Sequence, residues 1–291
     1  MARNPNELFE KVDDLPPIPA VAAKVMSLVE DSRTTANDLA QVLAADQVLT
    51  AKLIKVSNSA YYGFSRKVST VREAVVAIGF KQVRQIAVGA SVIQGFKKSL
   101  LSTELFDLDL FWGHSMAVAV AAEALAKKTR VCKPEDAFTA GILHDIGRLI
   151  IRQGRPAEFE RAIQMARGGS ISLHAAEIRS TGFAHDEVGR ALGELWKFPS
   201  HLIDAIDGHH NSKLSPQEDG LSGVLAQANR LILHYGLFCG YDVDEGEPLP
   251  TPVDLLEVEA ASGGIDLILG RAFAFIEAAS GTPERWYSRA A

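Results

Sequence analysis

The sequence predicts an all-α protein, and three observations support this. Apolar residues recur three or four positions apart along most of the 291 residues, which is the spacing of one helix face. Strict alternation of apolar and polar residues, the pattern of a half-buried strand, is almost absent. Hydrophobic residues make up 47% of the chain and charged residues 23%, which indicates a globular protein with a sizeable core.

Residues 1–98 are predicted to form an N-terminal helical bundle. Helical spacing begins after "DDLPPIPA" and continues through "DQVLTAKLIKV" and "FKQVRQIAVGASVIQGF". Thr34 or Thr35 is suited to cap the second helix, and Thr70 with Glu73 forms a capping-box pattern before the next apolar run. The stretch from Asn58 to Gly63 indicates a turn.

Residues 99–238 are predicted to form a second helical bundle, packed against the first. A long alanine-rich helix is expected from His114 to Lys128. Another is expected from Pro134, because proline followed by two acids suits a first turn, and it includes "GILHDIGRLII". Shorter helices are expected in "EFERAIQMAR", "SLHAAEIRSTG", the segment from His185, "SHLIDAIDGHH" and "GVLAQANRLILHYG", with "PQEDGLS" as a loop. A helical C-terminal extension, 239–291, is predicted from "PVDLLEVEAASG" and "GIDLILGRAFAFIEAAS".

Charge and composition limit the classes of partner. The net charge of −6 argues against nucleic acid as a partner, and the few basic residues at Lys81, Arg84, Lys97 and Lys98 are expected to be solvated. The two cysteines fit no metal spacing and are expected to be reduced. Neither a secretory signal nor the roughly 18-residue apolar run of a membrane span is recognisable. A cytoplasmic protein is therefore expected.

Side chains that metals favour stand at predicted helix starts and ends. Imidazole and carboxylate ligands suit Fe, Mn, Zn or Ni better than Ca, and a carboxylate has two oxygens with which to bridge two ions. Taken singly, a histidine at a helix start is more often a helix cap or a satisfied core residue than a metal ligand. His174, His201 and His234 show no partner pattern and are expected to be structural. The candidate metal ligands are His114, His144, Asp145, His185, His209 and His210.

The order of these residues resembles that of the HD superfamily of metal-dependent phosphohydrolases. "LHDIGR" is similar to the HD-GYP type motif, which usually has Lys where Arg148 stands, and "FAHDEVGRALGELWKFPSHLIDAIDGHHN" is similar to the later ligand segment. "LPPIPAVAAKVMSLVED", "ADQVLTAKLIKVSNSAYYGF" and "VSTVREAVVAIGFKQVRQIAV" resemble the HDOD family, the HD-related output domain. The resemblance covers residues 10–235.

The resemblance implies a site for one or two divalent ions, with three departures from the family pattern, of which Arg148 in place of Lys is one. Asn229, in "ANRL", stands where an HD site has an aspartate, so one negative charge is missing. No glutamate adjoins the histidine pair and no "GYP"-like stretch follows "GHHNSKLSP". The features expected to recognise a cyclic dinucleotide are therefore lacking.

Two functions stay open at this point. The resemblance implies a bacterial signalling module, so the favoured interpretation is a stand-alone, non-catalytic regulatory domain. It would act through a signalling protein partner or a small nucleotide-like ligand. The alternative is a metal-dependent phosphohydrolase or phosphodiesterase for a nucleotide or cyclic nucleotide, with Asp145 at the metal and Arg148 facing the phosphate. Nothing in the sequence indicates an oligomeric state.

Overall fold

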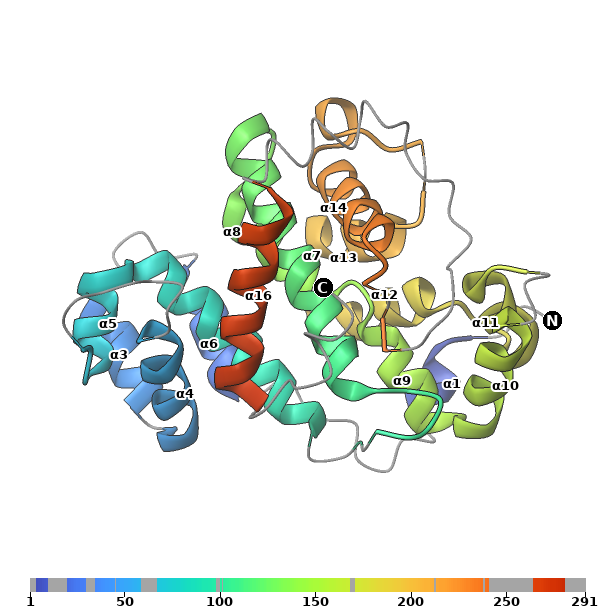
Figure 1. Ribbon diagram of the computed structural model, residues 1–291, viewed down its shortest axis with the longest axis horizontal. Coiled ribbons are helices and arrows are strands. Elements are labelled where there is room, and N and C mark those ends of the chain that lie inside the picture. Colours follow the sequence, from blue (N-terminus) through green and yellow to red (C-terminus); the bar gives the residue numbers. More distant parts are fainter. Residues whose placement is uncertain are drawn as a thin grey trace. The chain divides into compact units, whose positions relative to one another are not determined.

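The computed structural model describes residues 4–9, 20–29, 35–44, 46–58, 67–97, 100, 102–167, 171–211, 213–237, 239–240 and 264–280. Within these residues every regular element is an α-helix (Figure 1). The all-α prediction is therefore confirmed. The described residues form two compact units.

The smaller unit is a bundle of helices centred on α6, which packs against α2, α4 and α5. Two N-caps fix where its helices begin: Asp46 accepts from the backbone N–H of Leu49 at 2.9 Å, and Thr70 from that of Glu73 at 3.1 Å. The second of these caps was predicted from the sequence. The helices are α2 (Ala20–Val29), α3 (Ala36–Ala44), α4 (Gln47–Ser57), α5 (Val71–Ile78), α6 (Phe80–Lys97) and residues 270–280 of α16 (Ile265–Ser280).

The larger unit is built around α7, a 22-residue helix that is buried without interruption from Phe111 to Glu123. Helices α8 and α14 pack against α7, while α9, α12 and α13 follow one another as packed neighbours (Figure 1). The unit consists of α1 (Asn6–Phe9), α7 (Leu108–Thr129), α8 (Pro134–Leu143), α9 (Ile146–Gly154), α10 (Pro156–Arg167), α11 (Leu173–Thr181), α12 (His185–Leu195), α13 (Ser200–Gly208), α14 (Pro216–His234) and the first turn of α16.

Three predicted helix boundaries in the larger unit were wrong. Helix α7 begins at Leu108, where Asp107 caps it, so His114 lies inside the helix rather than at its start. The helix from Pro134 is interrupted at His144 and Asp145 and restarts at Ile146. The segment predicted as the loop "PQEDGLS" belongs to α14, because Ser215 caps a helix there and Gly220 kinks it with φ 55° and ψ −119°.

The predicted division at 98/99 and 238/239 remains a prediction. The described part of residues 239–291 is divided between the units, with residues 239–240 and 264–269 in the larger one. The second helical pattern of this tail forms α16, whereas the first, residues 252–263, lies outside the described residues.

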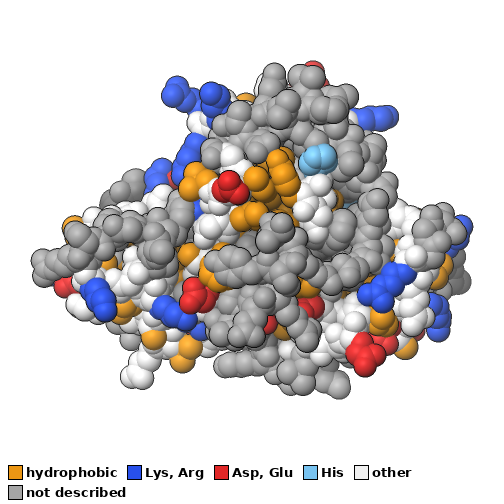
Figure 2. All heavy atoms as spheres, viewed as in Figure 1, with side chains coloured by type: hydrophobic (Ala, Val, Ile, Leu, Met, Phe, Trp, Pro, Cys, Tyr) orange, Lys and Arg blue, Asp and Glu red, His pale blue; other side chains and the backbone are white. Residues whose placement is uncertain are grey.

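The basic side chains of the described surface are scattered. In Figure 2 the Lys and Arg side chains stand singly or in small groups rather than in one continuous field. Arg84, from the short basic stretch, is buried. Neither cysteine forms a disulfide. In the part of the chain that the structure describes, no helix is long and apolar enough to cross a membrane.

Candidate metal centre

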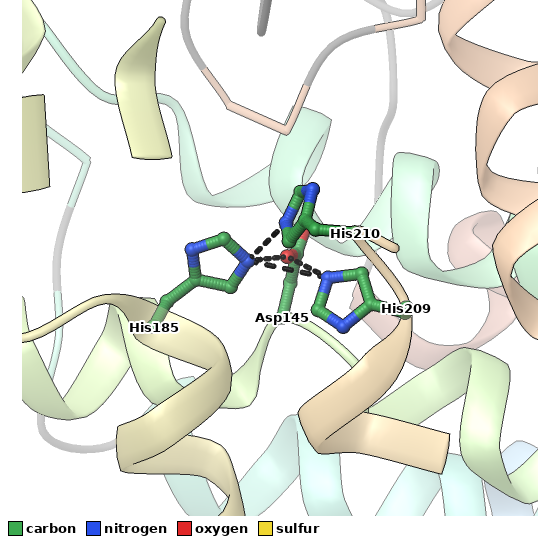
Figure 3. Close-up of side chains that lie close together, drawn as sticks. All are labelled: Asp145, His185, His209 and His210. Atoms are coloured by element: carbon green, nitrogen blue, oxygen red, sulfur yellow. Dashed lines mark hydrogen bonds and ion pairs between the residues drawn. The ribbon is translucent and has the colours of Figure 1, made fainter. Parts of the chain in front are cut away.

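The histidines and the aspartate chosen from the sequence lie together in the larger unit. They form two groups that share Asp145, and within each group the ligand atoms lie within 4.8 Å of one another. Figure 3 shows His185, at the start of α12, and His209 and His210, at the end of α13, converging on Asp145, which lies in the turn between α8 and α9. The two groups are His114, His144 and Asp145, and Asp145, His185, His209 and His210.

The break between α8 and α9 allows two adjacent residues to face one point. Neighbouring side chains on an unbroken helix diverge by about 100°. Asp145 instead has φ −97° and ψ 5°, in the sparsely populated bridge region, and this turn directs its carboxylate to the same place as the His144 ring. Gly147, two residues after Asp145, allows α12 to approach this turn, because any Cβ there would overlap the carbonyl oxygen of His185 on α12.

Asp145 occupies the centre of the cluster and uses both of its oxygens. Its Oδ2 lies 3.2 Å from Nε2 of His144 and 3.6 Å from Nε2 of His114. Its Oδ1 lies 3.1 Å from Nε2 of His185 and 3.6 Å from Nε2 of His209. The carboxylate therefore faces one histidine group with each oxygen, which is the arrangement that the bridging role requires.

Four of the rings are held in one tautomer by the acceptor at Nδ1. Nδ1 of His114, His144 and His209 donates to a main-chain carbonyl, at 2.6, 2.8 and 2.6 Å, and Nδ1 of His185 donates to the Glu177 carboxylate at 2.6 Å. The carbonyl acceptors belong to Leu237, Gly141 and Ile206. A neutral ring that carries its proton on Nδ1 presents a lone pair at Nε2, and each Nε2 faces Asp145.

The distances between the Nε2 atoms show whether the site suits a metal ion. The Nε2 atoms of His114 and His144 are 3.2 Å apart, and so are those of His185 and His209. In neutral rings of this tautomer neither nitrogen has a proton to donate, so the contact is repulsive until a cation lies between them. Two nitrogens about 2.1 Å from one ion and about 100° apart are separated by about 3.2 Å. The donor set therefore fits a divalent ion.

The buried charges shift the titration of the cluster. Burial raises the pKa of Asp145, but the charge of Arg148 and the contacts with His144 and His185 hold that pKa well below its usual value. Burial and Arg148 lower the pKa of His185, yet the Glu177 charge and the hydrogen bonds to Asp145 and Glu177 raise it to about 10. Burial lowers the pKa of His209 and of His210. A proton on His185 and a metal ion thus compete for one lone pair.

Arg148 does not face an open site. The phosphohydrolase alternative has it facing a phosphate, whereas its side chain is 0% exposed and bonds to two buried carboxylates. Its Nη1 donates to Oδ2 of Asp145 at 2.7 Å, and its Nε donates to Oε1 of Glu177 at 3.1 Å. The fork of the guanidinium is therefore occupied within the protein.

Asn229 is buried on α14, the helix that packs against α7. Its Oδ1 has no hydrogen-bond partner among the described residues. A buried amide oxygen without a donor is costly and would suit a cation as its partner. The assignment of Asn229 to the metal centre stays a prediction.

The sequence interpretation missed Glu177 and the neighbours of His174. Glu177 lies with Leu173 and Ala176 on one face of α11, and a charge on an apolar face was the signal that would have identified it.

His174, expected to be structural, bonds through Nε2 to both oxygens of Asp186 at 3.2 Å. Its ring centroid lies 5.0 Å from that of His210. His201 lies 3.3 Å from Asp136, away from the cluster.

Comparison with known proteins identifies related chains. The HDOD domain family matches residues 15–212. A protein of uncharacterised function from Treponema pallidum (strain Nichols) is 25% identical over 229 residues. That match covers 77% of this chain and 43% of the relative, so the chain spans less than half of that protein's length.

Solved structures agree with this grouping. An HDOD domain protein of unknown function from Geobacter sulfurreducens has a TM-score of 0.76 and 28% identity, over 92% of this chain and 87% of that one. A presumed phosphohydrolase from Shewanella amazonensis SB2B has a TM-score of 0.71 and 28% identity, over 94% and 98%. A presumed signal transduction protein from Marinobacter aquaeolei VT8, 22% identical over 90% and 60% with a TM-score of 0.72, shares the fold.

Proposed function

The chain belongs to the HDOD domain family, and from that premise we propose that it is a regulatory signalling domain with a buried divalent-metal centre and no hydrolytic activity. The observation that carries the proposal is the closure of the centre. Five of the six candidate ligands, all except His210, are at most 1% exposed. A catalytic metal site keeps a coordination position open for water and substrate, whereas a structural site is closed by protein ligands.

Arg148 supports the same conclusion. A phosphate substrate needs a cation that faces it, and the residue that resemblance placed in this role is enclosed by Asp145 and Glu177. Releasing it would leave two buried carboxylates without their partner, which costs several kcal/mol. We therefore assign Arg148 to the protein interior and not to a ligand.

The ions would be held by the two groups that share Asp145. His114, His144 and Asp145 would hold one ion, and Asp145, His185, His209 and His210 a second. Nitrogen-rich donor sets of this kind suit Fe, Mn, Zn or Ni. Asn229 would contribute an amide oxygen without charge, which would weaken the site relative to one closed by aspartate.

The mode of action follows from a closed centre. A domain that carries out no hydrolysis transmits a state to something else, so we propose a signalling protein partner or a small nucleotide-like ligand in the cytoplasm. Nucleic acid is a poor candidate, because the chain carries a net charge of −6. The metal would hold α7 and the ends of α8, α9, α12 and α13 in one arrangement on which that interaction depends.

The test is elemental analysis of protein purified without added metal, together with a phosphate-release screen on nucleotides and cyclic dinucleotides. We expect bound Fe, Mn, Zn or Ni near stoichiometry and no turnover. His144→Ala is expected to lower the metal content. His201→Ala, which changes a 52% exposed side chain outside the cluster, is the matched control. Turnover that His144→Ala abolishes would overturn the non-catalytic proposal, and absence of any bound metal would overturn the metal centre.

A second candidate, a metal-dependent phosphohydrolase, is favoured by one observation. The two oxygens of Asp145 face different histidine groups, as a carboxylate between two ions would. Two divalent ions supply a nucleophile from water at neutral pH and neutralise charge on a phosphate. The chain's own part would be to orient the six ligands, with the half-buried His210 nearest to solvent. The phosphate-release screen above decides between the two candidates.

A further inference from the structure

Glu177 is a fully buried carboxylate that no sequence motif predicted. It is 0% exposed and lies on α11, a helix that contributes no candidate metal ligand. Burial of a carboxylate is unfavourable unless donors surround it, and Glu177 receives three. The backbone N–H of His185 donates to Oε2 at 3.1 Å, the His185 Nδ1–H donates to the same oxygen at 2.6 Å, and Arg148 Nε donates to Oε1 at 3.1 Å.

These contacts join the two histidine groups through one chain of side chains. Glu177 holds the ring of His185, which belongs to one group, and holds Arg148. Arg148 in turn donates to Oδ2 of Asp145, the oxygen that faces His114 and His144. A displacement of Glu177 would therefore move His185 directly and would move the shared carboxylate, Asp145, through Arg148.

The identity of residue 148 is explained by this geometry. An ammonium group is a single point of charge, whereas a guanidinium offers separate N–H groups on a rigid plane. Arg148 uses Nη1 for Asp145 and Nε for Glu177, so one planar group fixes the separation of two carboxylates. The Lys usual in the resembling motif lacks this fork.

We propose that Glu177 and Arg148 are a positioning pair, in which Glu177 orients the His185 ring for the metal and Arg148 transmits that orientation to Asp145. The inference rests on the proposed metal centre, and it names residues that act on the centre without binding the ion. A partner of this kind fixes the tautomer of a ligating imidazole and raises its basicity. Its loss typically weakens metal binding by 10–100-fold.

Glu177→Gln is the sharpest variant because it keeps shape and burial. An amide has one acceptor oxygen and one donor NH₂. Whichever way the Gln amide points, either the His185 donors or the Arg148 Nε faces an N–H group. Glu187→Gln on α12 is the matched control, since that carboxylate is exposed and accepts from the backbone N–H of Ala184 at 3.3 Å.

The experiment titrates metal-free protein with Co²⁺ and records its absorption bands, alongside long-range ¹H–¹⁵N correlation spectra of the histidine rings without metal. For Glu177→Gln we expect Co²⁺ affinity to fall about 10–100-fold and the ¹⁵N signals of the His185 ring to move away from their wild-type positions. Glu187→Gln should leave both readouts at wild-type values. Unchanged affinity and unchanged His185 signals in folded Glu177→Gln would overturn the inference.

Arg148→Lys provides a second route if Glu177→Gln does not fold. It keeps the buried charge and the Glu177–His185 contacts but removes the fork, so we expect Co²⁺ affinity to fall by about 10-fold, the lower end of the range for such partners. Affinity equal to wild type would overturn the role of Arg148. If wild-type protein binds no Co²⁺ while Glu177→Gln still alters the His185 ring, the metal proposal fails and the positioning of His185 stands.

Discussion

Gly147 of α9 lies directly against the backbone of His185 on α12. A Cβ at Gly147 would overlap the His185 carbonyl oxygen and would stand 2.7 Å from the backbone nitrogen of Gly189. Because both neighbours are main chain, no side-chain rotation relieves the overlap. The glycine after the His-Asp doublet therefore determines how closely a metal-ligand helix approaches the turn that carries Asp145.

Gly147→Ala is expected to destabilise the protein by about 3 kcal/mol or more, because α9 and α12 must separate to accept the methyl group. Chemical denaturation followed by circular dichroism measures this. Gly270→Ala is the control: it lies in α16 with nothing within 4 Å of the new Cβ. There, alanine should be neutral or stabilising by up to about 1 kcal/mol. Equal effects of the two variants would contradict the close approach.

Asp145→Asn tests the shared carboxylate. Asparagine keeps the shape but removes the charge that faces both histidine groups, so we expect the metal content of both groups to fall together. Elemental analysis of purified protein gives the ratio of metal to chain. Asp204→Asn, at an exposed position on α13, should keep the wild-type ratio. Loss of half the metal would show that Asp145 serves one group alone.

Asn229→Asp restores the missing charge and has opposite effects on the two forms of the protein. Without metal, a buried carboxylate has no partner and should lower the free energy of unfolding by about 1–3 kcal/mol. With Mn²⁺, the added charge should raise affinity, so that the metal-dependent rise in Tm becomes larger than in wild type. Asn211→Asp, at an exposed site, should change neither value. An unaltered response to Mn²⁺ would separate Asn229 from the centre.

Cys132 gives the chain a pH-dependent reaction far from the cluster. Burial, and then the negative charge of Asp136, raise the pKa of this thiol from 9.0 to about 11. The folded chain therefore holds its proton longer than the unfolded chain, and the stabilisation from this group is lost as pH rises from 9 to 11. In a Cys239→Ala background, the rate of alkylation by iodoacetamide should rise until about pH 11 in folded protein. In urea the alkylation rate should level off near pH 9. A rate that levels off near pH 9 in the folded protein as well would contradict the raised pKa of Cys132.

Periodicity and caps predicted most of the fold. Thr70 and the acids after Pro134 mark helix starts that the structure has, because capping is a local interaction between residues two or three apart. The break at Asp145 was missed since "GILHDIGRLII" has continuous helical spacing. Next to the break, Gly147 lies against His185 and Gly189, which are about 40 residues later in the chain, and such a tertiary contact leaves no trace in local spacing.

The candidate site, like the fold, was predicted where the information is local and missed where it depends on tertiary contacts. Six ligands were predicted because residue type and order carry that information. The pairing of Arg148 with Glu177 was missed, because burial and pairing between α9 and α11 depend on tertiary structure. His174 was likewise left without a partner, although Asp186 lies beside it.

Three of the four inward-facing imidazoles are oriented by main-chain carbonyls, at Leu237, Gly141 and Ile206. A main-chain carbonyl oxygen is present whatever the side chain of its residue. Substitutions at residues 206 or 237 therefore leave the acceptor in place as long as the backbone there keeps its conformation. The orientation of those rings is thus robust to sequence drift. The fourth ring, His185, depends on the side chain of Glu177. A single substitution at Glu177 could therefore disturb the orientation of this ligand while the fold is kept.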